Sequence, residues 1–204
     1  MDEGRQGRLL WILKAPVAGR VKTRLAEGIG ADAALAVYRR LVDLSWRRLA
    51  GIFPGEVHFD PPEAEAQMRG WLGGGATYHP QAKGHLGERI ESAIRGAFGR
   101  SGEPVVVLGG DCPYLDRSYV TAAFRGLSRV DVVVGPALDG GYVLIGMKRE
   151  QPALFRGIDW GSDSVLEQTL RQARKVGLTV KQLAPLEDVD DASSWERARR
   201  VLGL

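Results

Sequence analysis

The sequence predicts an α/β protein, a three-layer α/β/α sandwich built around a mostly parallel sheet. Short apolar runs alternate along the chain with stretches of helical periodicity, the order expected of parallel strands joined by covering helices. The runs at 105–108 and 132–134 are apolar without alternation, as expected of central strands buried on both faces. A chain of 204 residues suits one domain, so we expect residues 1–204 to form a single unit.

Six segments are predicted as strands because they are short, mostly apolar and bounded by glycine or proline. They are LLWIL (9–13), EVHFD (56–60), ATYH (76–79), VVVLGG (105–110), DVVVG (131–135) and YVLIGM (142–147). The glycine-rich segment 135–148 resembles a hairpin. Any antiparallel element of the sheet is therefore expected there.

Five segments are predicted as helices because their apolar residues fall on one face at helical spacing. They are 31–51, 84–99, 120–127, a helix that starts within 161–168, and 195–202. In the fourth, Ser164 and Glu167 have the spacing of a capping box.

The composition argues against several classes of protein. Lysine and arginine total 28 against 25 aspartates and glutamates, and a net charge of +3 does not indicate a dedicated nucleic-acid binder. The apolar run near the N-terminus is too short for a signal peptide, and no stretch approaches the roughly 20 apolar residues of a membrane span. A single cysteine, Cys112, excludes an internal disulfide. We expect a soluble, cytoplasmic protein.

The loop after the first predicted strand is rich in cations. Within eleven positions it holds Lys14, Arg20, Lys22 and Arg24. Pro16 would stiffen the entry to this loop, and Gly19 would let its backbone approach an anion closely. The segment matches neither a Walker A sequence nor G-x-G-x-x-G, which argues against a P-loop kinase and a Rossmann dehydrogenase. We expect the loop to bind the phosphates of a nucleotide.

Carboxylates follow the other predicted strands. Asp111 follows 105–110, Asp139 follows 131–135, and Asp188, Asp190 and Asp191 cluster near the C-terminus. Ligands of open α/β sheets bind at the carboxyl ends of the strands, so these carboxylates should gather beside the cationic loop. Cations and aspartates together suit the binding of phosphates along with a hard divalent cation. Mg²⁺ (or Mn²⁺) is therefore the expected cofactor.

Four segments taken together resemble the nucleotide-diphospho-sugar transferase superfamily, whose fold is termed GT-A. They are KAPVAGRVKTRL, GGDCPYL, DGGYVLIG and DVDD. The chain more closely resembles a bacterial glycosyltransferase-like family associated with radical-SAM and selenium-domain proteins. Weaker similarity extends to the molybdenum-cofactor and phospholactate guanylyltransferases. The resemblance covers residues 9–202 and implies a basic loop at the phosphates and a metal-binding aspartate after a central strand.

On this resemblance Asp111 is the expected metal ligand and a catalytic residue, with Lys22 as a second catalytic group. Asp190 matches the second metal-ligand position of related nucleotidyltransferases. Asp188 and Asp191 remain alternatives for that second position, although Asp191 fits the role of a helix N-cap better.

The remaining site predictions concern the substrate. Asp139 is either a turn residue or a functional one, as a substrate contact or a general base, and the expected substrate-binding residues beside it are Gly140, Gly141 and Tyr142. Gln81 could contact a base, and His85 could line the nucleotide pocket. Trp160 is expected in the core rather than in an acceptor-site wall. The three histidines (His58, His79 and His85) lack metal-ligand spacing, so a zinc site is not expected.

Three functions fit these residues. The first is a metal-dependent glycosyltransferase-like enzyme that moves a sugar from a nucleotide sugar to a small-molecule acceptor. The second is a nucleotidyltransferase, guanylyl- or cytidylyltransferase-like, that releases pyrophosphate. The third is a non-catalytic nucleotide-binding protein, against which the presence of both cations and carboxylates argues. The base, the acceptor and the oligomeric state are not specified by the sequence.

Overall fold

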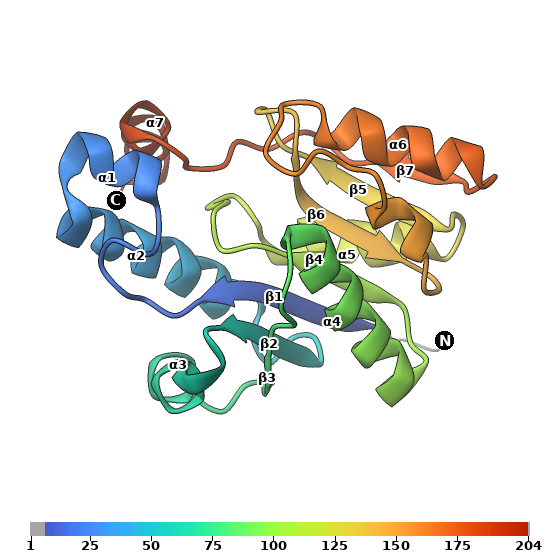
Figure 1. The fold of residues 1–204 in the computed structure, drawn as a ribbon, viewed down its shortest axis with the longest axis horizontal. Helices are drawn as coiled ribbons and strands as arrows, with labels where there is room; N and C mark the ends of the chain where they lie inside the picture. The colour runs from blue at the N-terminus through green and yellow to red at the C-terminus, as the bar shows by residue number, and fades with distance from the viewer. Residues whose placement is uncertain (1–6, 204) are drawn as a thin grey trace.

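The protein is built on one seven-stranded sheet of order β3-β2-β1-β4-β6-β5-β7, seen in a computed structural model that describes residues 7–203 (Figure 1). Every pair of neighbouring strands is parallel except the two pairs that include β6. The predicted sandwich with a mostly parallel sheet is therefore confirmed. The antiparallel element lies within 135–148, where the sequence places it.

The strands follow the apolar runs closely. Their bounds are β1 (Arg8–Lys14), β2 (Gly55–Asp60), β3 (Thr77–Pro80), β4 (Val105–Leu108), β5 (Val132–Pro136), β6 (Tyr142–Met147) and β7 (Val180–Gln182). All six predicted strands are present. β7 was not predicted because it is three residues long and carries no apolar run.

The helices include two that were not predicted. Their bounds are α1 (Thr23–Ile29), α2 (Ala31–Leu49), α3 (Glu65–Leu72), α4 (Leu86–Ser101), α5 (Arg117–Leu127), α6 (Val165–Lys175) and α7 (Ala192–Leu202), with 3₁₀ turns η1 (Pro62–Ala64) and η2 (Pro152–Phe155). α1 and α3 span only seven and eight residues, too few for a clear periodicity. Within residues 7–203 no helix is both long and apolar enough to cross a membrane.

The predicted capping box at the start of α6 is wrong. Ser164 is the N-cap residue, but its side chain accepts no backbone N–H of the helix. Its hydroxyl instead lies 2.7 Å from Nε2 of Gln168, which donates to it. The start of α6 is thus stabilised by side-chain bonds rather than by reciprocal capping.

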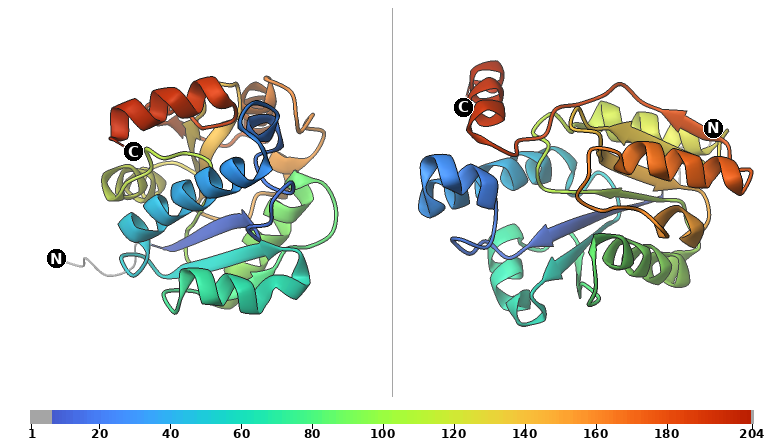
Figure 2. Two further views of the ribbon diagram at one scale, coloured as in Figure 1. Left: turned by 90° about the vertical axis from the view of Figure 1, so that its left-hand side faces the viewer. Right: turned by 45° about the horizontal axis from the view of Figure 1, so that its top comes forward.

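Helices cover both faces of the sheet, α4 and α6 on one side and α2 and α5 on the other (Figures 1 and 2). Successive residues of β1 point to opposite faces, so Leu9 and Trp11 join the core under α2 and α5 while Leu10 joins the core under α4. Because both faces are covered, the central strands are apolar at almost every position.

A third, smaller core lies outside the sheet and joins α1, α2 and α7. Leu25, Leu41, Val189 and Ala198 are fully buried in it. α1 and α7 approach closely, since a Cβ added at Gly28 would lie 3.3 Å from the side chain of Ala192. This packing brings the aspartate-rich segment before α7 against the start of α1 (Figure 2).

A buried carboxylate on β2 is surrounded by basic groups. Glu56 is fully buried, and its oxygens lie 2.5 Å from Arg100, 3.1 Å from His58 and 3.5 Å from Arg8. Burial alone would raise the pKa of Glu56, but hydrogen bonds from His58 and Arg100 outweigh it and hold the pKa at about 2. This network ties β2 to β1 and to the end of α4.

Glu56→Gln is expected to destabilise the protein by about 2 kcal/mol at pH 7, because the basic groups around this buried position would lose their counter-charge. The pKa of Glu56 is lowered in the folded state, so its stabilisation is complete above its ordinary pKa and is lost as the pH falls toward 2. Urea unfolding of wild type and variant should therefore differ most at pH 6–7 and converge as the pH falls below about 4. Glu150→Gln, which breaks the half-exposed pair with Arg95, is the control and should cost less than about 1 kcal/mol. Equal losses in the two variants would contradict the account.

Candidate active site

The candidate site lies at the edge of the sheet where the parallel strands end. β1 leads into the cationic segment, β4 leads to Asp111, β5 leads to Asp139, and the chain after β7 leads to Asp188. β6 runs the other way and begins at this same edge. The cations and carboxylates of separate segments therefore meet at one rim, as the sequence predicts.

The segment between β1 and α1 is anchored at both ends and exposed in the middle. Pro16 and Val21 are buried, whereas residues 17–20 are exposed. The N–H of Arg20 donates to the carbonyl of Val17 at 3.1 Å, and Gly19 has a φ of +75°, as the third residue of a type II turn does. No atom lies within 4 Å of a Cβ built on Gly19, so its φ rather than crowding requires glycine.

Two cations of this region project into solvent. Lys14 ends β1 and Arg20 ends the turn; both are exposed, and neither forms an ion pair with any carboxylate of residues 7–203. They are therefore available to an incoming anion. Lys14 is positioned by its backbone, since its N–H and carbonyl both bond the hydroxyl of buried Tyr38.

Lys22 connects the cationic segment to the carboxylates. Its Nζ lies 2.5 Å from Oδ1 of Asp111 and also donates to the carbonyl of Val189. The side chain of Lys22 is only 4% exposed, whereas that of Asp111 is 52% exposed. One face of the carboxylate is thus covered by the ammonium group and the other faces solvent.

Arg24 lies on a helix rather than in the predicted loop, because α1 begins at Thr23. Its Nη1 donates to Oδ2 of Asp190 at 2.7 Å in a largely exposed ion pair. The residue predicted as second metal ligand is therefore engaged by a cation. The N-cap role expected of Asp191 is confirmed: its side chain accepts the N–H of Ser194 at 2.7 Å.

Asp188 shares its surroundings with two other carboxylates. Burial, together with the negative charges of Asp139 and Asp111, raises the pKa of Asp188 to about 6, although Lys22 opposes the shift. Carboxylates held this close repel one another until a proton or a cation lies between them. Asp188, one of the alternatives for the second metal ligand, is thus the aspartate of the C-terminal segment whose charge interacts with that of Asp111.

Asp139 is a turn residue, and its Oδ2 forms no hydrogen bond with any of residues 7–203. Its Oδ1 accepts the N–H of Gly141 at 2.9 Å, and the residue is exposed. Gly140 has a φ of +91°, and a Cβ there would lie 1.7 Å from the carbonyl oxygen of Asp163, so no other residue fits. The turn is therefore fixed against the segment that precedes α6.

Tyr142 does not present its side chain to this edge, contrary to the prediction of a substrate contact. Its ring packs against the core under α4 and α6, edge-on to Trp160 at 6.3 Å, and its hydroxyl is buried. Trp160 itself is partly buried against the same core, as expected. Its indole lies so close to α4 that a Cβ at Gly87 would be 2.4 Å from Nε1.

Gln81 and His85 have structural roles at the same edge. Both amide hydrogens of Gln81 are used, since Nε2 donates to the carbonyls of Leu13 and His58 at 2.8 and 2.9 Å. His85 caps α4 through a capping box with Glu88. Gln81 thus joins the ends of β1 and β2, and its Oε1 accepts from Nη1 of Arg89 at 3.5 Å.

The donor set fits a hard divalent cation held jointly by protein and phosphate. Within residues 7–203, no three His, Cys, Asp or Glu side chains form a group that could hold a metal alone. Mg²⁺ commonly takes one or two carboxylates and completes its shell with water and phosphate oxygens, and Asp111 and Asp188 are the carboxylates that could hold it here. Burial raises the pKa of the nearby Cys112 thiol to about 12, so the thiol is protonated at neutral pH.

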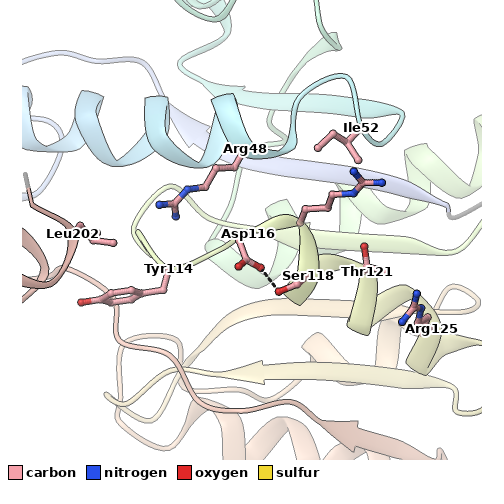
Figure 3. A pocket seen from close by; sticks show the side chains of 9 residues that line it. Arg48, Ile52, Tyr114, Asp116, Ser118, Thr121, Arg125 and Leu202 are labelled. Atoms are coloured by element: carbon pink, nitrogen blue, oxygen red, sulfur yellow. Dashed lines mark hydrogen bonds between the residues drawn. The ribbon is translucent and has the colours of Figure 1, made fainter.

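A surface pocket of about 860 Å³ lies elsewhere, between the end of α2, the start of α5 and the end of α7 (Figure 3). Arg48, Tyr114, Asp116 and Leu202 line it, and none of the predicted site residues does. Asp116 accepts the N–H of Tyr119 and Arg48 donates to the carbonyl of Pro113. These two polar side chains thus serve the local fold.

Comparison with protein families gives a match over residues 48–162 to the family described as "Uncharacterized protein conserved in bacteria (DUF2064)". The chain belongs to this family. None of the curated proteins matches it.

A solved structure from Desulfovibrio desulfuricans, assigned provisionally as a nucleotide-diphospho-sugar transferase, is 33% identical. The match covers 97% of this chain and 87% of that one, with a TM-score of 0.91. The fold is therefore that of the nucleotide-diphospho-sugar transferases.

More distant structures share the fold alone. A 4-diphosphocytidyl-2C-methyl-D-erythritol synthase from Anaerococcus prevotii is 10% identical with a TM-score of 0.61, over 98% of this chain and 100% of that one. Rv0371c from Mycobacterium tuberculosis, in complex with manganese, is 16% identical with a TM-score of 0.55, over 94% and 97%.

Asp188→Asn should stabilise the protein at neutral pH by about 1 kcal/mol. A pKa raised by about two units corresponds to about 2.7 kcal/mol, and solvent screening of this half-buried group reduces that value. Because the pKa is raised on folding, the cost of the charge is absent below pH 4 and grows as the pH rises through 6. Thermal unfolding at pH 7.5 and pH 4 should show the gain at the higher pH only. Asp190→Asn, the control, loses its bond to Arg24 and should not gain stability. A loss of stability in Asp188→Asn at pH 7.5 would contradict the account.

Proposed function

We propose that the protein is a metal-dependent transferase that acts on a nucleotide-activated substrate, and that it transfers a sugar from a nucleotide sugar to a small-molecule acceptor. One observation carries the proposal: cations of the segment 14–24 and carboxylates that follow three other strands meet at one edge of the sheet, joined by the contact between Lys22 and Asp111. The 33% identical relative with its provisional nucleotide-diphospho-sugar transferase assignment supports the choice of donor.

In this proposal the segment after β1 binds the phosphates of the nucleotide. Arg20 offers a planar pair of donors suited to phosphate oxygens, whereas Lys14 and Lys22 act as compact point charges. Arg24, on α1, can join them when it leaves Asp190. The turn at Gly19 is exposed, so its backbone can approach an anion closely, and buried Pro16 fixes the start of the turn.

Asp111 and Asp188 would hold Mg²⁺ or Mn²⁺ in the proposed enzyme. Bound there, the metal would supply positive charge that stabilises the departing nucleoside diphosphate. Asp188 replaces Asp190 as the proposed second ligand because Asp190 is paired with Arg24, while Asp188 is close enough to Asp111 for their charges to interact. Asp190 then serves to position Arg24.

Asp139 is the proposed general base. Its Oδ1 is held by the N–H of Gly141, which fixes the orientation of the carboxylate and leaves Oδ2 to accept a proton from the acceptor hydroxyl. The acceptor would lie along the Gly140–Gly141 backbone. Because Tyr142 is packed in the core, its contribution is to hold this turn rather than to touch the substrate.

Nucleotidyl transfer is the second candidate, and the charge of the phosphate-binding segment favours it. Lys22 and Arg24 are paired with carboxylates. Lys14 and Arg20 are exposed and have no carboxylate partner among residues 7–203, so they add two further positive charges. A triphosphate carries more charge than the diphosphate of a nucleotide sugar and would use more of these cations. In this reaction a phosphorylated acceptor attacks the α-phosphate and pyrophosphate leaves.

A thermal-shift screen of nucleotide sugars and nucleoside triphosphates, with Mg²⁺ or with EDTA, tests the proposal. A ligand at 100 times its Kd adds about 2.7 kcal/mol, which for a chain of this size raises Tm by roughly 5–10 °C. Asp111→Asn keeps the shape of the site but removes a charge, so the Mg²⁺-dependent part of the shift should disappear. Asp32→Asn, on the first turn of α2, is the matched control and should respond like wild type.

Product analysis of the best ligand then separates the two reactions. Release of a nucleoside diphosphate supports sugar transfer, and release of pyrophosphate supports nucleotidyl transfer. The proposal fails if no nucleotide stabilises the wild type, or if Asp111→Asn responds to Mg²⁺ as the wild type does.

A further inference from the structure

Two cations of the candidate site are paired with two of its carboxylates. The Nζ of Lys22 lies 2.5 Å from Oδ1 of Asp111, and Nη1 of Arg24 lies 2.7 Å from Oδ2 of Asp190. Two side chains that could bind phosphate, Lys22 and Arg24, are therefore paired with two carboxylates, those of Asp111 and Asp190. The pair at Lys22 is the more sheltered, because its side chain is 4% exposed while that of Arg24 is 71% exposed.

The backbone of Lys22 indicates that this contact is a specific arrangement. Its φ of 50° and ψ of 48° are left-handed, and within residues 7–203 it is the one residue other than glycine with a positive φ. This conformation is unfavourable for a side chain with a Cβ and persists where the surroundings enforce it. Here the buried neighbours Val21 and Leu25 fix the chain on either side, and the carbonyl of Val189 accepts from Nζ.

The ammonium of Lys22 competes with a metal for Asp111. A divalent cation bound to Asp111 would share the single negative charge of this carboxylate with the ammonium of Lys22, and the two cations would repel each other. A phosphate oxygen placed near Nζ changes this balance, because it draws the ammonium from the carboxylate and adds negative charge next to the metal. Conversely, phosphate without metal would meet the carboxylates of Asp111, Asp139 and Asp188.

We propose that Lys22 makes metal binding and polyphosphate binding interdependent: its ammonium weakens metal binding at Asp111 until phosphate engages it, so that each ligand favours the binding of the other. This inference rests on the proposed function, since it assumes that the phosphates bind beside Lys22. By linkage, the factor by which polyphosphate tightens metal binding equals the factor by which metal tightens polyphosphate binding. Lys22 is thus the residue on which this coupling depends, in addition to any direct contact between metal and phosphate.

The test measures Mn²⁺ binding by electron paramagnetic resonance, with MnCl₂ alone and with inorganic tripolyphosphate, corrected for Mn²⁺–tripolyphosphate in solution. Lys22→Met removes the charge and keeps a side chain of similar length. It should bind Mn²⁺ alone about tenfold more tightly than wild type, and tripolyphosphate should then tighten Mn²⁺ binding by a smaller factor than in wild type. Lys22→Arg keeps the charge and should behave like wild type.

The controls separate the coupling from other effects. Lys148→Met, just beyond the far end of β6, should leave Mn²⁺ binding unchanged. Circular dichroism checks the fold, and Lys22→Gln, which can still donate toward Val189, replaces the Met variant if that variant unfolds. Mn²⁺ affinity that is unchanged or weaker in a folded, uncharged Lys22 variant overturns the inference, because the ion pair is then a permanent structural link. If tripolyphosphate and nucleotides fail to bind the wild type, the proposed function fails. The comparison of Mn²⁺ affinities between wild type and variant still decides whether Lys22 weakens metal binding at Asp111.

Discussion

Burial of the central strands on both faces is the constraint on which this structure depends. β1 and β4 lie side by side in the middle of the sheet, and helices cover each face of it. Almost every position along these two strands is therefore apolar. Polar side chains of these segments therefore lie beyond the ends of the two strands. Because the strands are parallel, those ends coincide at one edge, and that edge receives the cations after β1 and the carboxylate after β4. The position of the site thus follows from the packing of the core.

The third core completes the site from outside the sheet. Leu25 of α1, Leu41 of α2 and Val189 before α7 are buried together. The backbone of Val189 also bonds to the other parts of the site, since its N–H donates to the carbonyl of Asp111 at 3.0 Å and its carbonyl accepts from Lys22. Asp188 and Asp190 flank this buried anchor on either side. Asp190 pairs with Arg24, whereas Asp188 lies near the negative charges of Asp111 and Asp139.

The sequence predicts the parts of this arrangement that depend on local patterns. The apolar runs of β1, β4 and β6 locate the sheet, and the residues directly after β1 and β4 are those that meet in the structure. α1 was missed because seven residues show no period, and Arg24 was consequently assigned to a loop. The choice between Asp188 and Asp190 depends on where Arg24 lies, so it could not be made from spacing. Glu56 was missed for a related reason: its partners Arg8 and Arg100 are distant in the sequence, and only the fold brings them to it.

The central claim is that one metal and the phosphates of one nucleotide bind between the segment after β1 and the carboxylates after β4 and β7. Anomalous diffraction at the manganese edge, from crystals grown with MnCl₂ and the nucleotide that stabilises the protein most, tests it directly. The account predicts a single strong manganese peak within about 2.3 Å of carboxylate oxygens of Asp111 and Asp188, with phosphate density against Arg20 and Lys22. A manganese peak remote from Asp111, or phosphates bound away from residues 14–24, would contradict it.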